Sequence, residues 1–195
     1  METLAKFFGN LHRVLAAGFI LAILVIIGQI TATHADFTAW LFSAFRWAHV
    51  WFGILWIGLL YYFNFVQIPS MPKIPDEQKP AIGKVIAPTA LFFFRWGAAF
   101  TVLFGLLTAQ FDKGYLVDAL TFQREHLIGL GMWLALIMAF NVWFIIWPNQ
   151  KKALGLVEAD AEAKKNAART AMIASRLNTL LSIPMIYCMV MAKFG

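Results

Sequence analysis

The feature that most constrains the fold is a series of five apolar stretches, each long enough to cross a lipid bilayer as a helix. The chain of 195 residues is 61% hydrophobic and only 13% charged, which is far from the mixture found in soluble domains. The sequence therefore predicts an all-α, polytopic membrane protein, a five-transmembrane-helix bundle that forms a single membrane domain over residues 1–195. The predicted helices cover residues 14–30, 40–66, 88–109, 122–147 and 172–192, with an amphipathic surface segment over 151–170.

Prolines mark the expected ends of these helices. Four prolines between residues 67 and 80 predict an extended loop, Pro88 is expected in the first turn of the third helix, and Pro148 is expected to stop the fourth. Pro184 lies inside the fifth helix and predicts a kink there. The first apolar stretch follows a basic lead and also fits a cleaved signal peptide, but we expect an uncleaved helix.

The positive charges predict the orientation of the bundle. Five crossings place the two termini on opposite sides of the membrane. Ten of the sixteen lysines and arginines fall on the side of the N-terminus, four fall on the other side, and Arg95 and Arg176 lie inside the spans. The positive-inside rule then predicts a cytoplasmic N-terminus and a periplasmic C-terminus in an inner membrane. Because topology explains the net charge of +6, the expected surroundings are membrane lipid, and nucleic acid is not an expected partner.

Two histidines stand near the start of the second and fourth predicted helices. Seventy-seven positions separate His49 from His126, and each is followed by a glycine within four residues and by a tryptophan at the seventh. The match continues to Phe-Asn pairs that end in Asn64 and Asn141, so the two spans form a weak internal repeat. Both helices run in the same direction, and an arginine precedes each histidine by two or three residues, so we expect both imidazoles at one depth.

Two imidazoles at one level are the minimum needed to ligate a b-type haem from both faces. We therefore predict haem b, with two axial ligands, two glycines that let the ring approach, two tryptophans beside it, and two arginines at the rim for its propionates. In that order the predicted haem-site residues are His49, His126, Gly53, Gly129, Trp56, Trp133, Arg46 and Arg124.

Other interpretations of the histidines remain open at this point. A single histidine in a membrane is more often hydrogen-bonded to a neighbouring helix than bound to a metal. A zinc or copper site needs a third ligand, for which His34 and Glu125 are the candidates. Cys188 is the only cysteine, so the chain has no intrachain disulfide and no C-x-x-C-H for covalent haem attachment.

A second group of polar residues lies toward the N-terminal side of the membrane. No acidic residue is expected at their level, so the two arginines among them need an anion, a haem propionate, carbonyl groups or water. The functional interpretation is a pocket for an anionic or electron-rich planar molecule, a substrate or a quinone. The alternative is that these side chains snorkel or bond between helices. The group comprises Asn64, Gln67, Arg95, Asn141, Arg176 and Asn178.

Several long motifs resemble the N-terminal membrane domain of the PuuD-type bacterial urate oxidase family. They include R-W-A-H-V-W-F-G-I-L-W-I-G from residue 46, R-W-G-A-A-F-T-V-L-F-G from residue 95, the segment 126–152 with its N-V-W-F-I-I-W-P-N-Q-K block, and N-T-L-L-S-I-P-M-I-Y-C-M-V-M at 178–191. In that family a membrane domain is followed by a periplasmic c-type cytochrome, and the pair is taken to oxidise urate. The resemblance implies a redox function in the membrane. It also implies that His49 and His126 are the histidines that resemble those of the family.

These observations predict an inner-membrane redox protein that holds haem b and passes electrons to a periplasmic or respiratory-chain acceptor. Because the chain has no C-x-x-C-H, we expect a partner such as a c-type cytochrome on the side of the C-terminus, or a larger complex. The alternatives are a cofactor-free structural subunit of a larger membrane complex and a transporter of a purine-like anion. Alanine at either His49 or His126 is expected to abolish haem retention.

Overall fold

Every regular element of the chain is helical in the computed structural model, which describes residues 1–33, 36–111 and 114–192. Five helical stretches in these ranges are long and apolar enough to cross a membrane, which confirms the predicted all-α, five-helix membrane protein. They are Leu11–Thr33, Phe37–Lys73, Lys79–Phe111, His126–Ala153 and Ala161–Met191.

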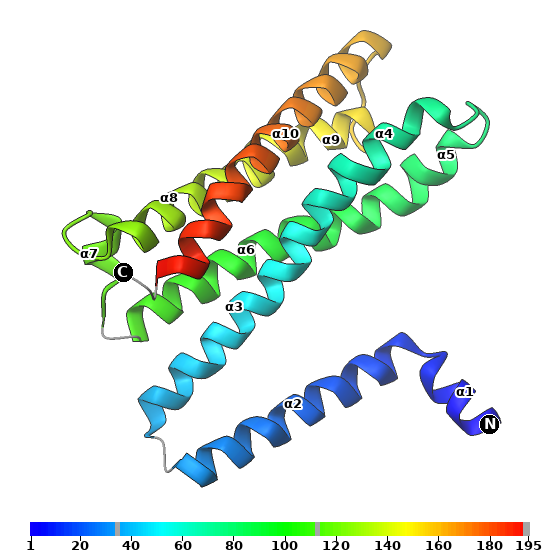
Figure 1. Cartoon of the computed structure of the whole chain (residues 1–195). Helices are drawn as coiled ribbons and strands as arrows, with labels where there is room; N and C mark the ends of the chain where they lie inside the picture. Colours follow the sequence, from blue (N-terminus) through cyan, green and yellow to red (C-terminus); the bar gives the residue numbers. More distant parts are fainter. Residues whose placement is uncertain (34–35, 112–113, 193–195) are drawn as a thin grey trace. The chain divides into compact units, whose positions relative to one another are not determined.

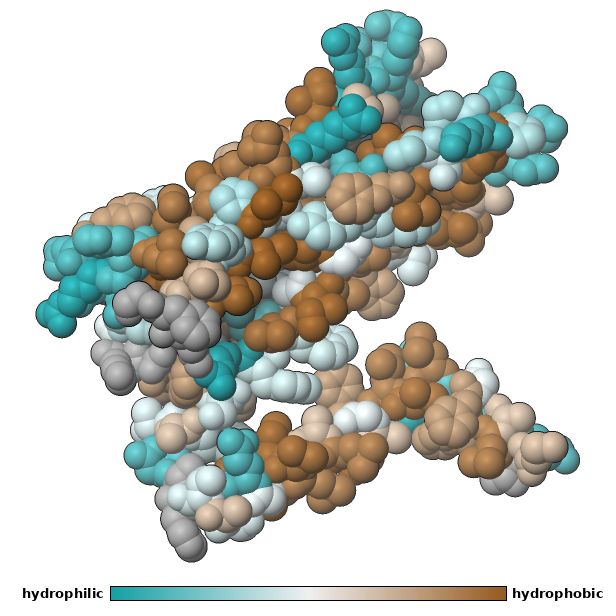
Figure 2. All heavy atoms as spheres, viewed as in Figure 1, coloured by the Kyte–Doolittle hydropathy of each residue, from teal (hydrophilic) through white to brown (hydrophobic). Residues whose placement is uncertain are grey.

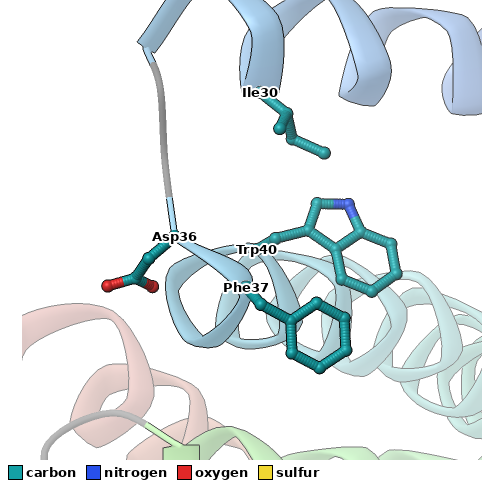
Figure 3. Close-up of a pocket in the computed structure, with 4 residues that line it drawn as sticks. All are labelled: Ile30, Asp36, Phe37 and Trp40. Atoms are coloured by element: carbon teal, nitrogen blue, oxygen red, sulfur yellow. The ribbon is translucent and has the colours of Figure 1, made fainter.

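The packing divides the chain into two units, Met1–Leu41 and Phe42–Gly195, and each is described by itself. The first unit contains α1 (Glu2–Phe8), α2 (Leu11–Thr33) and the first residues of α3 (Phe37–Tyr61). Asp36 caps the start of α3 by accepting a hydrogen bond of 2.7 Å from the backbone N–H of Ala39. Beside it the rings of Phe37 and Trp40 stack, and Trp40 points toward Ile30 across a cavity of about 400 Å³ (Figure 3). The lining of this cavity is apolar apart from the Asp36 carboxylate, which turns away from the ring of Trp40.

The second unit is built from the rest of α3 and from α6 (Ala87–Phe111), α8 (His126–Phe140) and α10 (Ala161–Met191). Within it α3 crosses α6, and α8 runs beside α10 (Figure 1). The short helices α4 (Ile68–Ser70), α5 (Lys79–Ala81), α7 (Leu116–Leu120) and α9 (Trp147–Ala153) complete it. Its core is formed by large side chains that are almost fully removed from the surface, namely Trp56, Leu60, Phe94, Met138 and Val142.

Three of the long helices contain a wider, π-helical segment, and each segment ends two residues before a proline. The segments are η1 (Tyr62–Gln67), η3 (Ile82–Ile86) and η4 (Asn141–Ile146), and the prolines are Pro69, Pro88 and Pro148. A proline inside a helix has no N–H to donate, and its ring clashes with the carbonyl four residues earlier. A wider turn before the proline relieves this clash, so the helix continues through it.

The π-helical segments explain where the sequence predictions of helix ends were wrong. The fourth spanning helix does not stop at Pro148 but continues to Ala153, and the third begins at Lys79, nine residues before Pro88. The expected loop over 67–80 is shorter, because helical structure continues to Lys73. In the segment 151–170, residues 154–160 connect α9 to α10, and residues 161–170 are the first turns of α10, which passes through Pro184 without a break.

The surface of the second unit has the distribution of polarity expected across a bilayer. In Figure 2 apolar residues cover the middle of its helices on the visible face, whereas hydrophilic residues gather around α7 at one end and around α4, α5 and the start of α10 at the other. We call the latter the α4–α5 end. The chain is therefore a multi-pass membrane protein that contacts lipid.

Candidate functional site

His49 is held tightly between α3 and α6. Its Nδ1 lies 2.8 Å from the carbonyl oxygen of Thr101. Because a carbonyl can only accept, Nδ1 carries the proton of this hydrogen bond, and in the neutral imidazole Nε2 then keeps a lone pair. The ring rests on Gly105, where even a Cβ atom would come within 2.8 Å of Nδ1. A histidine that donates one N–H to a carbonyl and keeps the other nitrogen unprotonated has the arrangement typical of a metal ligand.

His126 has a different setting, because it is the exposed first residue of α8. Trp56 and Trp143 lie at a similar level of the bundle. The backbone of Trp56 contacts Gly97 of α6, and the ring of Trp143 contacts the ring of the neighbouring Trp96. His49 precedes Trp56 by seven residues, whereas His126 precedes Trp143 by seventeen. At about 1.5 Å per residue, the difference places His126 about 15 Å farther along the bundle than His49. The structure therefore does not bring the two predicted axial ligands together.

The glycines and tryptophans of the internal repeat also differ in their surroundings. Gly129 packs against the backbone of Ala119 in α7, so it does not open a space beside His126. A Cβ atom added at Gly53 would lie at an ordinary van der Waals distance from the side chain of Thr101, and the glycine that contacts the His49 ring is Gly105. The sequence pattern does not reveal Gly105, because the register between α3 and α6 is set only by packing.

Trp56 and Trp133 are likewise placed differently. Trp56 is fully buried in the core, and its Nε1 donates to no acceptor in the described part of the chain. Trp133 is 44% exposed, and its Nε1 donates to the carbonyl of Leu120 at 2.9 Å. The two tryptophans therefore do not form matching walls of one site.

The two rim arginines are both exposed. Arg124 lies 3.4 Å from a carboxylate oxygen of Asp118, and Arg46 lies over the ring of Phe42. Of the two further candidate metal ligands, Glu125 is exposed, and His34 lies outside the described residues. Within residues 1–33, 36–111 and 114–192, no group of three His, Cys, Asp or Glu side chains is placed to hold a metal ion.

The predicted polar pocket is also not assembled as one site. Asn141 donates to Asn178 at 2.9 Å, and Asn178 donates to the carbonyl of Met138 at 2.9 Å, so both amides serve to join α10 to α8 and η4. Arg176 is exposed. The guanidinium of Arg95 packs 3.8 Å from the centre of the Trp147 ring, a cation–π contact that stabilises it without an anion.

We expect the substitution Asn178→Leu to lower the free energy of unfolding by about 1–2 kcal/mol, because it leaves the buried Asn141 amide without its partner. Unfolding of the purified protein in mixed detergent micelles measures this change. Asn166→Leu is the matched control, since Asn166 is exposed in the same helix, and we expect its effect to stay within about 0.5 kcal/mol. Equal effects of the two substitutions would contradict the role given to the Asn141–Asn178 pair.

A cavity of about 320 Å³ lies at the α4–α5 end of the second unit, where the three π-helical segments meet. Its wall includes Gln67, whose Oε1 is buried and accepts no hydrogen bond from the described residues. Asn64 adjoins it, because its Nδ2 donates to the cavity-lining Ser175 at 2.8 Å, while its own Oδ1 is buried and also lacks a donor among those residues. The described residues that line the cavity include no charged side chain.

Of the predicted polar residues, only Asn64 and Gln67 are therefore associated with this cavity. Sequence reasoning missed Ser175 of α10, because its sequence context is that of an ordinary small residue in a helix. The prolines two residues beyond each π-helical segment are the sequence signal that marks this region.

Comparison with known proteins gives one match. The model of the family described as "Urate oxidase N-terminal" matches residues 98–195, just over half of the chain. The matched part begins inside α6 and includes α8, η4, α9 and α10. Searches of curated proteins and of solved structures found no significant match.

Proposed function

Because the chain belongs to the urate oxidase N-terminal family, we propose that this urate-oxidase-like membrane protein binds haem b and transfers electrons across the inner membrane. The observation that carries the proposal is His49, whose imidazole is fixed by Thr101 and Gly105 inside a membrane-spanning helix. A polar side chain in such a position is usually functional.

If the protein binds haem, the residues fit one that His49 alone would hold better than one held between two histidines. His49 has the hydrogen bond that orients a ligating imidazole, whereas His126 is exposed and about 15 Å away along the bundle. Haem supplies a one-electron carrier when it is bound. The chain's own contribution is to fix the ring plane of His49 and the proton on its Nδ1 through Thr101 and Gly105.

The remaining parts of the proposal follow from topology. The proposal includes a cytoplasmic N-terminus and a periplasmic C-terminus, because lysine and arginine concentrate on the N-terminal side. A c-type cytochrome or larger complex on the periplasmic side would accept the electrons. Oxidation of urate by this chain is the activity to test together with such a partner.

An absorption spectrum of the purified full chain tests the proposal. We expect a reduced-minus-oxidised difference band typical of b-type haem. A protein that is folded and inserted but shows no such band would instead be the cofactor-free structural subunit of a larger complex.

A further inference from the structure

Two cations from different membrane-spanning helices meet at one indole ring. The guanidinium of Arg95 in α6 lies over the ring of Trp147, 3.8 Å from its centre, and the ammonium of Lys151 lies 5.7 Å from the same centre. Trp147 begins α9, and Lys151 follows one turn later in the same helix. The ring therefore gathers two positive charges at one level of the bundle.

The ring does not satisfy the hydrogen-bond donors of these cations. A guanidinium carries five N–H donors and an ammonium three, and neither group can accept. Within residues 1–33, 36–111 and 114–192, no carboxylate pairs with Arg95 or Lys151, and no oxygen accepts a hydrogen bond from either side chain. Both residues are half-buried and their nitrogen atoms are not among the buried ones, so a ligand outside the bundle can reach these donors.

The pair of cations lies near the depth of the lipid headgroups. The Nε1 of Trp143 donates to the backbone carbonyl of Arg95 at 3.1 Å, so the backbone of Arg95 is close to the level of Trp143, one turn before Trp147. The Arg95 side chain therefore extends toward the α4–α5 end, as snorkelling arginines do. Trp147 is six residues, about 9 Å, from the end of the spanning helix at Ala153, where interfacial tryptophans occur.

Deeper in the membrane, the cations are followed by an apolar surface. Trp96, Phe100 and Leu103 follow one another on one face of α6, at a spacing of three or four residues. Trp96 and Leu103 are 40% and 47% exposed, and the ring of Trp96 meets that of Trp143 edge to face, 5.4 Å between centres. A cationic site above an apolar strip has the polarity of a phospholipid.

We propose that Arg95 and Lys151, gathered at Trp147, bind the phosphate of an anionic phospholipid in the leaflet at the α4–α5 end. Arginine donates in pairs to phosphate oxygens, and lysine adds a second charge. A zwitterionic phospholipid also carries a phosphate, but the two cations repel its own ammonium group. The site therefore prefers a lipid with net negative charge. This proposal goes beyond the haem proposal and does not depend on it.

Nondenaturing mass spectrometry of the purified full chain, released from detergent, tests the proposal. The probes are phosphatidylglycerol and phosphatidylcholine with the same acyl chains, and the dissociation constant of the first bound lipid is measured for each. We expect phosphatidylglycerol to bind about five- to tenfold more tightly. Equal affinities would overturn the site. Displacement of phosphatidylglycerol by an equal concentration of inorganic phosphate or urate would show that the site takes a free anion, and would overturn the lipid as its ligand.

Three substitutions assign the preference to this site. We expect Arg95→Gln to reduce the ratio of phosphatidylglycerol to phosphatidylcholine affinity about three- to fivefold, and Lys151→Gln about two- to threefold. Arg176→Gln is the matched control, because it also removes an arginine from a membrane span, but Arg176 is exposed and contacts no aromatic ring of the described residues. We expect it to leave the ratio unchanged.

Both affinities are measured on one preparation of each variant, so a general loss of folded protein does not alter their ratio. Equal reductions in Arg95→Gln and Arg176→Gln would show that the preference follows net charge alone. That result, or an unchanged ratio in Arg95→Gln or Lys151→Gln, would refute the assignment.

Discussion

Replacing His49 by alanine is expected to reduce haem affinity by more than about tenfold, so that the purified protein retains little or no haem. The substitution removes the imidazole that Thr101 orients and Gly105 accommodates, and leaves the apolar character of the helix unchanged. Haem content per chain, measured by absorption after detergent purification, reports the loss. Insertion of the variant in the membrane fraction controls for folding.

His126→Ala is the matched control for this prediction. Because His126 is exposed at the start of α8, we expect the variant to keep most of its haem. This differs from the expectation based on sequence alone, in which either histidine was essential. Loss of haem in both variants would support a site in which both histidines bind the iron. Retention of haem in both variants would show that His49 is not a ligand.

The second large effect is expected at Gly129, where α8 packs against the backbone of α7. A methyl group at this position would collide with the backbone carbonyl of Ala119. Backbone atoms cannot rotate away as a side chain can, so Gly129→Ala must move α7 or α8, and we expect a loss of about 1–3 kcal/mol in the free energy of unfolding. Unfolding in mixed detergent micelles measures this loss.

Gly58 in α3 provides the comparison, because a methyl group there meets no neighbouring atom within 4 Å. We expect Gly58→Ala to stabilise the protein by about 0.5–1 kcal/mol, as alanine does in a helix interior. If the two substitutions changed stability in the same direction by the same amount, the close approach of α7 and α8 would be refuted.

The number of helices could be predicted from the sequence, because length and hydropathy define a membrane span with little help from tertiary contacts. The helix ends could not. Pro88 and Pro148 follow the usual rule for helix boundaries, yet both lie within continuous helices after a π-helical turn. Whether a helix stops at a proline or widens before it depends on packing that a single sequence does not contain.

The candidate site was predictable only in part for a similar reason. His49 was identified because a histidine in an apolar span needs an explanation, and its placement supports that reasoning. Its supposed pairing with His126 rested on equal depth, but α3 begins at Phe37, twelve residues before His49, whereas α8 begins at His126 itself. The contacts of Gly105 and Ser175 come from helices that are distant in sequence, and the register between them is set by packing.

Electron paramagnetic resonance of the oxidised, purified full chain tests the central claim most directly, because it reports both the presence of haem and the number of strong axial ligands. We predict a high-spin ferric haem signal, which indicates one histidine on the iron, and its disappearance in His49→Ala. A low-spin signal from two nitrogen ligands, or a protein without any haem signal, would contradict the account.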